Sequence, residues 1–459
     1  MPAIGLLGHY LELYDRVAPS ARPGIEGFYR EVAAGLGARG IRVVEAGVCR
    51  VRSEFEAAVA AFEEAGVDAI VSLHLAYSPS LESADALAAT RLPLVVLDTT
   101  PSPSYGPATD PDELMYNHGI HGVQDLCNVL LRRGKRFQIE AGHGGDALDR
   151  VAAWATAAAV ASRLRRARVG VVGAPFAGMG DFAVHAATLR ETLGIEVVPL
   201  PFERIRARLP EPGAPGVVAE MESDRIVFEA DGLDPGAHRA ATMVGLAVRR
   251  LLEEDGLSDL TVNFDSFNSS CGLPTVPFLE ASKGMARGVG YAGEGDAMTA
   301  AFVGALSSAW PETTFTEMFC PDWEGDAVFV SHMGELNPAL CVGRARLVAK
   351  PMPWISVGTP VIAVGRFRPC MATFADLAPA PNGEYRLLTA RVEMLDVVGE
   401  DRHTEAIRGW FRPPVPVADF LAAYSRAGGT HHAALVYGDV TAGLARLSEL
   451  QGWALTVIG

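Results

Sequence analysis

Three stretches near the N-terminus decide the fold: IRVVEAG at 41–47, EFEAAVAAFEEAG at 54–66 and AIVSLHL at 69–75. The outer two are short apolar runs, whereas the middle one spaces its apolar residues as one face of a helix does. This alternation is typical of βα units and of a parallel sheet covered on both faces. AIGLLG at 3–8 and LPLVVLD at 92–98 add a strand on either side, and no helix is predicted between AIVSLHL and LPLVVLD. The front of the chain is therefore predicted to be a parallel α/β domain.

Polar residues follow several of these predicted strands. His9, His74 and the loop after Asp98 all come at the carboxyl end of a strand. Ligands of parallel sheets bind beyond that end, so we expect a polar site there.

The remainder of the chain divides at two changes of pattern. VGVVG at 169–173 and DLTVNF at 259–264 continue the βα rhythm, and past Trp310 short alternating strands separated by Pro and Gly take over. These strands are DAVFVS, RARLVAK, PVIAVGRFR and YRLLTARVEML, a pattern typical of an antiparallel, barrel-like sheet. We therefore predict an α/β protein. Its domains are two Rossmann-like parallel α/β domains, residues 1–166 and 167–310, and a β-rich, antiparallel, barrel-like C-terminal domain, residues 311–459.

Composition excludes several classes of function. The 459 residues hold 39 Lys and Arg against 55 Asp and Glu, a formal charge of −16, which disfavours general binding to a phosphate backbone. No run of about 18 apolar residues predicts a membrane span, and the N-terminus has no basic region typical of a signal peptide. The six Cys form no CxxC pair, which fits reduced thiols. We expect a cytoplasmic protein with no nucleic-acid or membrane partner.

Two carboxylates stand in patterns that could carry chemistry. Glu294 lies in Gly-Glu-Gly-Asp, where glycines on both sides let the backbone approach a ligand closely. Taken alone, the same pattern is more often a solvated turn in which Asp296 caps the next helix. Glu317 is a lone carboxylate in TTFTEMF, and it must be paired, bound to a metal or exposed, because an unpaired buried charge is too costly.

Histidines supply the other two patterns. His332 ends the strand VFVS, and the pair His431 and His432 follows a glycine turn. A strand-end histidine is more often a hydrogen-bonded core residue than a ligand. Adjacent side chains of an extended segment point to opposite faces, so only one of the pair can serve a given site.

Together the four patterns offer two carboxylates and two imidazoles without a thiol. Such a set suits Mn²⁺, Co²⁺ or Mg²⁺ better than structural zinc. A metal of this kind polarises substrate oxygens while a carboxylate moves a proton between carbons.

The same segments resemble motifs of a known family. YAGEGDAMTAAF, TFTEMF, VFVSHMGELNPAL and RAGGTHHAAL resemble, in order and separation, the motifs of L-arabinose isomerases. In the front of the chain YNHGIHGVQD, VSLHLAYSP and FAGMGDFAV resemble further motifs of that family. The chain is identified by this resemblance as a member of the L-arabinose isomerase and L-fucose isomerase superfamily.

The resemblance implies an activity and a set of site residues. It implies a Mn²⁺-dependent aldose–ketose isomerase (or one using Co²⁺ or Mg²⁺), in a homo-oligomer, hexamer or tetramer, with sites at subunit interfaces. The two glutamates would be acid and base of an ene-diol mechanism, and like charges close together would raise the pKa of one of them. The metal ligands implied are Glu294, Glu317, His332 and His432, and the residues implied to contact the sugar are His121, Met179, Phe264 and His431.

Departures from the family pattern fall on the substrate side. The chain reads LLGHYLELYDR where the family has Gly-Ser-Gln-His-Leu-Tyr, Asp125 is one methylene shorter than the family's carboxylate, and SFNSSCGLPTVP is compressed. The sugar is therefore expected to be L-arabinose or a related or modified one, including a 6-sulfonated, sulfoquinovose-like sugar. An anionic sugar needs a cationic partner, for which Arg366, Arg368 and Arg412 are candidates, although solvated surface is their default interpretation.

Two other classes of function remain as alternatives. A sugar-binding module without catalysis would share the α/β halves, but it has no need of two Glu and two His from distant segments. A nucleotide-dependent oxidoreductase is suggested by VGVVGAPFAGMG, whose glycines do not fit G-x-G-x-x-G.

Overall fold

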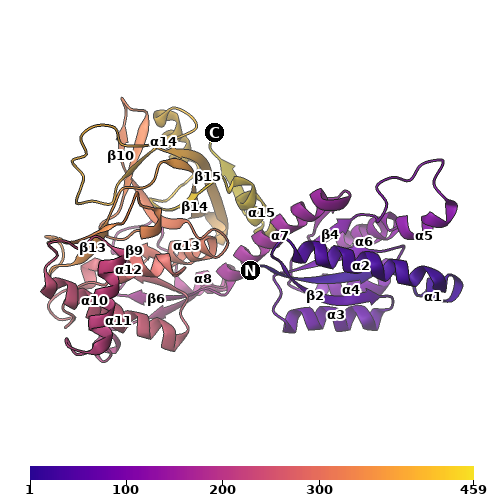
Figure 1. Ribbon diagram of the computed structural model, residues 1–459, viewed down its shortest axis with the longest axis horizontal. Helices are drawn as coiled ribbons and strands as arrows, with labels where there is room; N and C mark the ends of the chain where they lie inside the picture. Colours follow the sequence, from indigo (N-terminus) through magenta and orange to yellow (C-terminus); the bar gives the residue numbers. More distant parts are fainter. The chain divides into compact units, whose positions relative to one another are not determined.

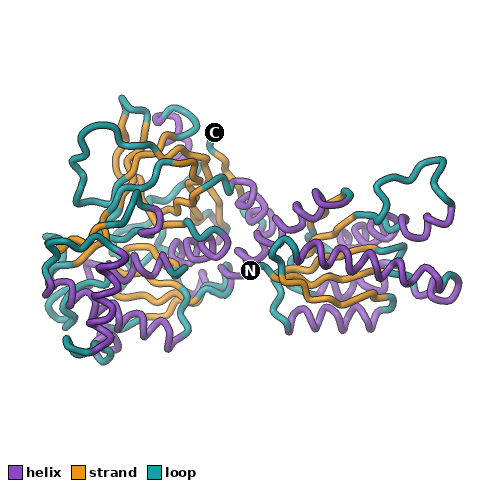
Figure 2. The backbone as a smooth tube through the Cα atoms, viewed as in Figure 1, coloured by secondary structure: helices purple, strands orange, loops and turns teal.

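The computed structural model describes residues 1–459, and the chain divides into two compact units, Met1–Ser162 and Arg163–Gly459. Figure 1 shows the helices and strands of both units, and Figure 2 shows the loops that connect these helices and strands. The division of the second unit at residue 310 stays a prediction.

The first unit is built on a five-stranded parallel sheet in the order β2-β1-β3-β4-β5. Figure 1 shows α2 and α3 with β2 between them, and buried side chains of α3, α4 and α6 share one core with the strands. The strands are β1 (Ala3–His9), β2 (Arg42–Cys49), β3 (Ala69–His74), β4 (Leu94–Asp98) and β5 (Gln138–Ala141). The helices are α1 (Glu12–Val17), α2 (Arg22–Gly37), α3 (Arg52–Glu64), α4 (Ser80–Ala89), α5 (Leu114–Asn117), α6 (Ile120–Arg132) and α7 (Gly144–Arg165).

The strand order of this sheet reverses between β1 and β3. Their last residues, His9 and His74, are directly paired in the register, at the carboxyl edge predicted for a polar site. The sequence pattern missed helix α4 between β3 and β4, because its small residues make a weak helical face. A crossover helix is what a parallel pair of strands requires there.

The second unit begins with a four-stranded parallel sheet in the order β7-β6-β8-β9. Helix α13 packs against β9 and is buried over most of its length. The strands are β6 (Arg168–Val172), β7 (Glu196–Pro199), β8 (Asp259–Val262) and β9 (Gly290–Gly293). The helices are α8 (Ala186–Thr192), α9 (Phe202–Arg206), α10 (Pro215–Val227), α11 (Pro235–Asp255), α12 (Phe278–Ala286) and α13 (Ala297–Ala309).

Most of the remaining strands of the second unit form a closed antiparallel barrel. Six strands follow one another as β14-β17-β10-β11-β16-β15, and the pairing of β14 with β15 closes the ring. The predicted fold class is therefore confirmed. The barrel strands are β10 (Thr313–Asp322), β11 (Ala327–Ser331), β14 (Cys370–Pro379), β15 (Tyr385–Met394), β16 (Gly409–Arg412) and β17 (His432–Tyr437), joined by β18 (Ala454–Val457) and the helices α14 (Val417–Arg426) and α15 (Thr441–Gln451).

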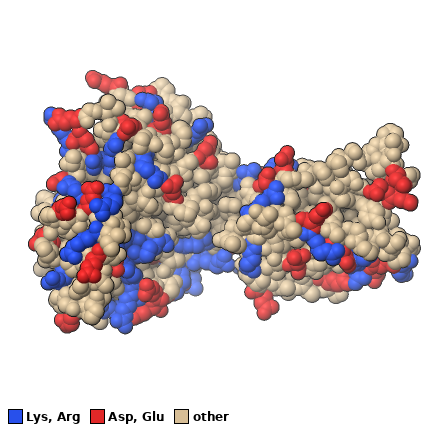
Figure 3. All heavy atoms as spheres, in the orientation of Figure 1, with Lys and Arg blue, Asp and Glu red and all other residues tan.

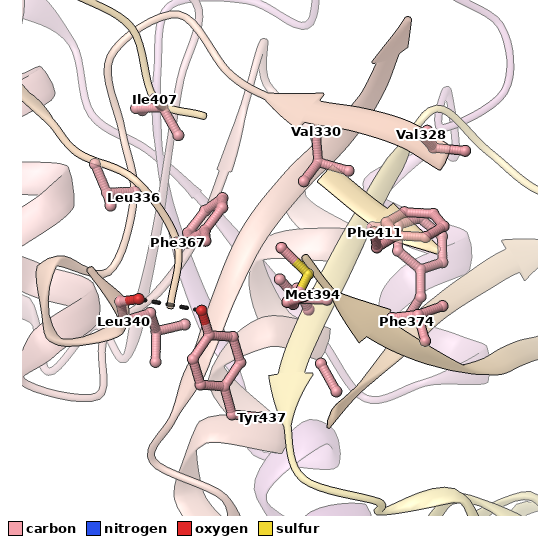
Figure 4. Close-up of a cluster of buried hydrophobic side chains, with 14 of the residues drawn as sticks. Val328, Val330, Leu336, Leu340, Phe367, Phe374, Met394, Ile407, Phe411 and Tyr437 are labelled. Atoms are coloured by element: carbon pink, nitrogen blue, oxygen red, sulfur yellow. Dashed lines mark hydrogen bonds between the residues drawn. The ribbon is translucent and has the colours of Figure 1, made fainter. Parts of the chain in front are cut away.

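Apolar side chains from all sides of the barrel form one buried cluster (Figure 4). Phe374 and Phe411 lie 5.6 Å apart between ring centroids, and the Tyr437 hydroxyl donates to the Leu340 carbonyl at 3.1 Å. The barrel wall is held rigid by this packing, and so are the site residues that it carries.

Two of the strands assigned to the barrel from sequence lie elsewhere. RARLVAK and PVIAVGRFR form β12 (Arg346–Ala349) and β13 (Val361–Val364), which pair with each other in a separate two-stranded sheet. Their alternation predicted strands correctly but could not specify the partner, because β13 is buried against α12 instead.

Other features of the chain bear on its predicted partners. None of its helices combines the length and the apolar character needed to cross a bilayer. Acidic and basic side chains are interspersed over the face shown in Figure 3. The six cysteines are free, three of them buried and Cys320 exposed.

Candidate functional site

The barrel register brings three of the predicted residues together. Glu317 on β10 is directly opposite His432 of β17 on one side and Ser331 of β11 on the other. Directly opposed residues of antiparallel strands have Cβ atoms about 5 Å apart, so their side chains meet. His332 follows Ser331 immediately, which brings a second imidazole beside Glu317.

Glu294 reaches the same place from the parallel sheet. It follows the last residue of β9 and has a φ of 63°, which is the left-handed region that few residues other than glycine adopt. A Cβ on Gly295, whose φ is 86°, would lie 2.5 Å from Pro175 Cα. A non-glycine residue in the left-handed region, such as Glu294, is strained, and strain of this kind clusters at functional sites. The glycine motif found in the sequence is required by this turn.

The four side chains converge on one another. Glu317 Oε1 is 3.1 Å from His432 Nε2 and 3.3 Å from His332 Nε2. Glu294 Oε2 is 3.4 Å from His432 Nε2. The side chains of His332 and His432 are 2% and 0% exposed, so these contacts lie away from solvent.

Buried carboxylates behind the two histidines fix their orientation. The ring atom His332 Nδ1 lies 2.7 Å from Glu335 Oε2, and His432 Nδ1 lies 2.9 Å from Asp296 Oδ2. The Tyr291 hydroxyl donates to the other oxygen of Glu335 at 2.5 Å. With each Nδ1 held by a carboxylate, each Nε2 is directed toward Glu317, as in histidines that ligate metals.

Sequence reasoning assigned no role to these second carboxylates at the site. Asp296 was interpreted only as a helix cap, and the structure shows that it does both: Oδ1 accepts from Thr299 N at 2.9 Å while Oδ2 pairs with His432. Glu335 stands three residues after His332, a spacing that could have indicated the pair.

Aromatic rings enclose the histidines. Phe315 packs edge-on against both His332 and His432, and Phe182 stacks on His432 with centroids 4.8 Å apart. A Cβ on Gly293 would lie 3.0 Å from His332 Nε2, so glycine at this position allows the close approach of the ring. The apolar walls lower the local dielectric and strengthen the charge interactions inside.

His431 occupies a different environment. Its side chain is 37% exposed, its Nδ1 lies 2.6 Å from Asp181 Oδ2, and its Nε2 is 3.7 Å from Glu294 Oε2. Ligand atoms of Glu294, Glu317, His431 and His432 all lie within 4.8 Å of one another. His332 lies outside that group of four, but its Nε2 is 3.3 Å from Glu317 Oε1, which belongs to the group. The geometry thus offers three common ligands and two candidates for the fourth.

Ion pairing shifts the pKa values of the cluster. Burial alone would lower the pKa of His332, but the carboxylates of Glu335 and Glu317 raise it to about 10. Burial would raise the pKa of Glu294, but the neighbouring imidazoles of His431 and His432 lower it to about 2. The pKa of Glu317 is lowered for the same kind of reason. The expectation that one glutamate has a raised pKa is wrong, because two imidazoles outweigh the repulsion between the carboxylates.

The donor set also fits a cation. His432 Nε2 and Glu294 Oε2 are buried and make no hydrogen bond of acceptable geometry. Buried polar atoms are nearly always satisfied, so two orphaned atoms that face each other indicate a ligand between them. Two carboxylates and two imidazoles are a donor set for Mn²⁺ and similar divalent ions.

The residues predicted to contact sugar are placed as follows. Phe264 lies 5.7 Å from Phe176 between ring centroids, and the Phe176 amide donates to the Glu294 carbonyl at 2.9 Å, so Phe264 is linked to the cluster. Met179 lies in the segment that also carries Asp181, the partner of His431. His121 lies in α6 of the first unit, on its exposed side. Their contacts with a sugar stay predictions.

Comparison with known proteins matches the second unit and much of the whole chain. The sequence profile of the L-arabinose isomerase central domain matches residues 228–309, and that of the L-arabinose isomerase C-terminal domain matches residues 312–453. The L-arabinose isomerase of Nocardioides sp. is 25% identical over 412 residues, which cover 83% of this chain and 78% of the relative. That of Herpetosiphon aurantiacus is 25% identical, covering 75% and 70%, and that of Acidothermus cellulolyticus is 26% identical, covering 85% and 79%.

The two matched segments of this chain contain Glu294, Glu317, His332 and His432, the four residues that the fold brings together. By these matches the chain belongs to the L-arabinose isomerase family, whose enzymes are aldose–ketose isomerases and thus intramolecular oxidoreductases.

Proposed function

We propose that this enzyme is a metal-dependent aldose–ketose isomerase that acts on L-arabinose or a related sugar by ene-diol proton transfer. The observation that supports it is the convergence of two glutamates and two histidines in a buried cluster with two orphaned polar atoms at its centre. A sugar-binding module without catalysis would have no use for this arrangement.

Glu294, Glu317, His332 and His432 would hold the ion, which we propose to be Mn²⁺, with Co²⁺ or Mg²⁺ as substitutes. His332 is preferred to His431 as the fourth ligand because it is buried and its Nδ1 is held by a buried carboxylate. His431 is more exposed, so we assign it to contact with the sugar. When bound, the metal supplies polarisation of adjacent substrate oxygens.

The two glutamates would move the protons. Their oxygens lie within 4.8 Å of each other, which allows one carboxylate to reach the carbon next to the carbonyl while the other serves the oxygens. Their lowered pKa values keep both ionised at neutral pH, so each can accept a proton. Phe315 and Phe182 exclude water around the histidines, and Asp181 orients His431 toward the sugar.

The proposed substrate is a neutral sugar. Each arginine considered as a partner for an anionic group is already paired: Arg366 with Asp396, Arg368 with Glu312, and Arg412 with Glu393 at 3.0 Å. A sulfonated sugar therefore finds no free cation among them, and it enters the test as the contrasting substrate. Met179 and Phe264 would line the sugar pocket, and His121 would complete it from a neighbouring subunit of a homo-oligomer.

The decisive test is an NMR assay of aldose-to-ketose conversion with Mn²⁺ and with EDTA. The panel would hold L-arabinose, D-galactose, L-fucose, D-glucose and sulfoquinovose, for the native chain and for Glu294→Gln. We expect conversion of one neutral sugar that EDTA abolishes and that the substitution reduces at least about 10²-fold, while the exposed-site control Glu253→Gln stays unchanged. Conversion in EDTA at the full rate would contradict metal dependence, and preference for sulfoquinovose would overturn the neutral substrate.

The fourth ligand is tested by metal binding alone. His332→Gln and His431→Gln would each be titrated with Mn²⁺ by calorimetry. We expect the first to weaken binding by at least tenfold more than the second. The reverse ranking would make His431 the ligand.

A further inference from the structure

Four arginines gather around a pocket in the second unit. The pocket has a volume of about 360 Å³, within the range of about 300–1,000 Å³ that holds small ligands. Its lining contains a single carboxylate and none of the residues of the isomerase site. The charged lining residues are Arg344, Arg346, Arg366, Arg408 and Glu229.

The balance of charge around this pocket is opposite to that of the whole chain. The protein has 55 acidic against 39 basic residues, so an excess of cations around one hollow runs against its composition. Like charges that share one pocket repel one another, and an anion bound between them relieves that repulsion. The excess of arginines therefore favours an anionic ligand.

Two of the arginines have no carboxylate partner. Arg344 donates only to the Ile226 carbonyl at 3.1 Å, and Arg346 donates only to the Thr404 carbonyl at 3.0 Å. A guanidinium has five N–H donors, so most of the donors of both remain available. The other two are paired, Arg408 with Asp401 at 2.6 Å and Arg366 with Asp396, and so they add less charge.

Paired backbone segments fix the positions of these arginines. Arg346 on β12 is directly opposite Val364 of β13, and Arg366 is bridged to Arg408. The Arg408 amide also donates to the Gly365 carbonyl at 3.0 Å. Three arginines are thus presented by hydrogen-bonded backbone, which lowers the ordering cost of binding.

We propose that this pocket binds a small dianion with a phosphate group. The fork of an arginine matches the oxygens of phosphate with two parallel hydrogen bonds, and a dianion engages two unpaired guanidinium groups at once. The phosphate can be free or be the ester group of a sugar or other metabolite. Thr404, an exposed hydroxyl on the same rim, adds a neutral donor.

The test is calorimetric titration of the full chain with inorganic phosphate, with a pentose 5-phosphate and with acetate, at constant ionic strength. We expect saturable binding of one phosphate-bearing ligand per chain and at least tenfold weaker binding of acetate. An ester that binds at least tenfold tighter than inorganic phosphate identifies the ester as the ligand, and equal affinities identify free phosphate. Absence of saturable binding by both phosphates overturns the proposal.

Variants locate the binding in the pocket. Arg344→Gln with Arg346→Gln should weaken phosphate binding at least about a hundredfold, a factor of ten for each guanidinium removed. The control Arg391→Gln changes an arginine of β15 that is 59% exposed, and it should bind as the native chain does. Because the Gln variant also removes two hydrogen bonds to carbonyls, Arg344→Lys with Arg346→Lys serves as the second variant, expected to bind with intermediate affinity. Equal affinity of the native chain and both double variants would overturn the assignment.

Discussion

Two pairs of buried histidines, one in each unit, have pKa values shifted in opposite directions. His9 and His74 end neighbouring strands of the first sheet, and their rings stack with centroids 4.3 Å apart. Burial lowers the pKa of His74 to about 3 and lowers that of His9 as well. In the barrel, burial acts in the same direction on His332 and His432, yet the pKa of His332 is raised to about 10 and that of His432 is raised well above its usual value.

The difference comes from the groups behind each ring. His332 has a buried carboxylate on its Nδ1, whereas His9 Nδ1 and His74 Nδ1 have no partner and His9 Nε2 meets only the Ser72 hydroxyl. Burial by itself therefore favours a neutral histidine, whereas a carboxylate placed behind the ring raises its pKa and directs the other nitrogen, as in His332 and His432. The predictions below test this contrast.

The largest effect is expected from removing the carboxylate that both barrel histidines share. Glu317→Gln keeps the shape of the side chain but loses the charge next to His332 Nε2 and His432 Nε2. Turnover should fall at least about 10³-fold and Mn²⁺ affinity should fall as well, because one residue serves as base and ligand. NMR measurement of isomerisation checks this. Glu324→Gln, an exposed change in the turn of the same hairpin, should keep native turnover. Native turnover in Glu317→Gln would remove this residue from the mechanism.

The two pairs should respond to pH in opposite directions. His74 has a folded pKa below its unfolded value, so its contribution to stability is present above about pH 6.5 and is lost as the pH falls toward 3. His332, in protein stripped of metal, has a raised folded pKa. Its contribution is present below about pH 6.5 and is lost as the pH rises through about 10.

Each histidine should change the local free energy of opening by about 1.4 kcal/mol for every pH unit over which the two states differ in protonation. Hydrogen exchange with mass spectrometry, corrected for intrinsic rates, reads β3 and β11 separately. Between pH 5 and 7 protection of β3 should rise with pH, and between pH 7 and 9 protection of β11, which ends directly before His332, should fall. His74→Gln should flatten the first slope only. Slopes of the same sign in both strands would contradict the contrast.

Removing a carboxylate behind a barrel histidine should move that histidine toward the state of the first pair. In Glu335→Gln, the pKa of His332 should fall below about 10, because the largest interaction that raises it is lost. Mn²⁺ affinity should fall by about 10- to 100-fold, as is typical when the hydrogen-bond partner of a ligand histidine is changed. NMR titration of the histidine Cε1 proton and calorimetry measure the two effects. Tyr291→Phe removes only the hydroxyl that donates to Glu335 and leaves the carboxylate in place, so it should not lower the pKa of His332.

The strand and helix patterns predicted the two sheet types and the barrel, because local periodicity reports burial directly. Local periodicity could not indicate which strands pair with one another. β12 and β13 were placed in the barrel although they form a sheet of their own, and α4 was missed because Ser80–Ala89 has few large apolar residues. Strand pairing is a long-range property, so alternation within one segment carries no information about it.

For the site, the sequence predicted which residues take part but not the groups that orient them. Residue types and a family resemblance selected Glu294, Glu317, His332 and His432, and the register of β10 between β11 and β17 brings the last three together. The roles of Glu335 and Asp296 depend on side-chain orientation, which the sequence pattern does not encode. Which histidine provides the fourth ligand depends on a difference in burial between His332 and His431 that appears only in the fold.

The smallest expected effect concerns the hydroxyl beside the first pair. Ser72 Oγ lies 2.8 Å from His9 Nε2, and both residues are fully buried. Ser72→Ala would leave both nitrogens of His9 without a partner, since Nδ1 already has none. An unsatisfied buried polar group costs about 1–3 kcal/mol, so the free energy of unfolding should fall by about that amount in urea titrations at pH 7. Ser53→Ala, an exposed change on α3, should shift the free energy of unfolding by no more than about 0.5 kcal/mol.

His9 should stay neutral in Ser72→Ala, because removing a hydroxyl adds no carboxylate. If its Cε1 proton instead titrated above pH 6.5, the charge state of the barrel histidines could not be ascribed to the carboxylates behind them.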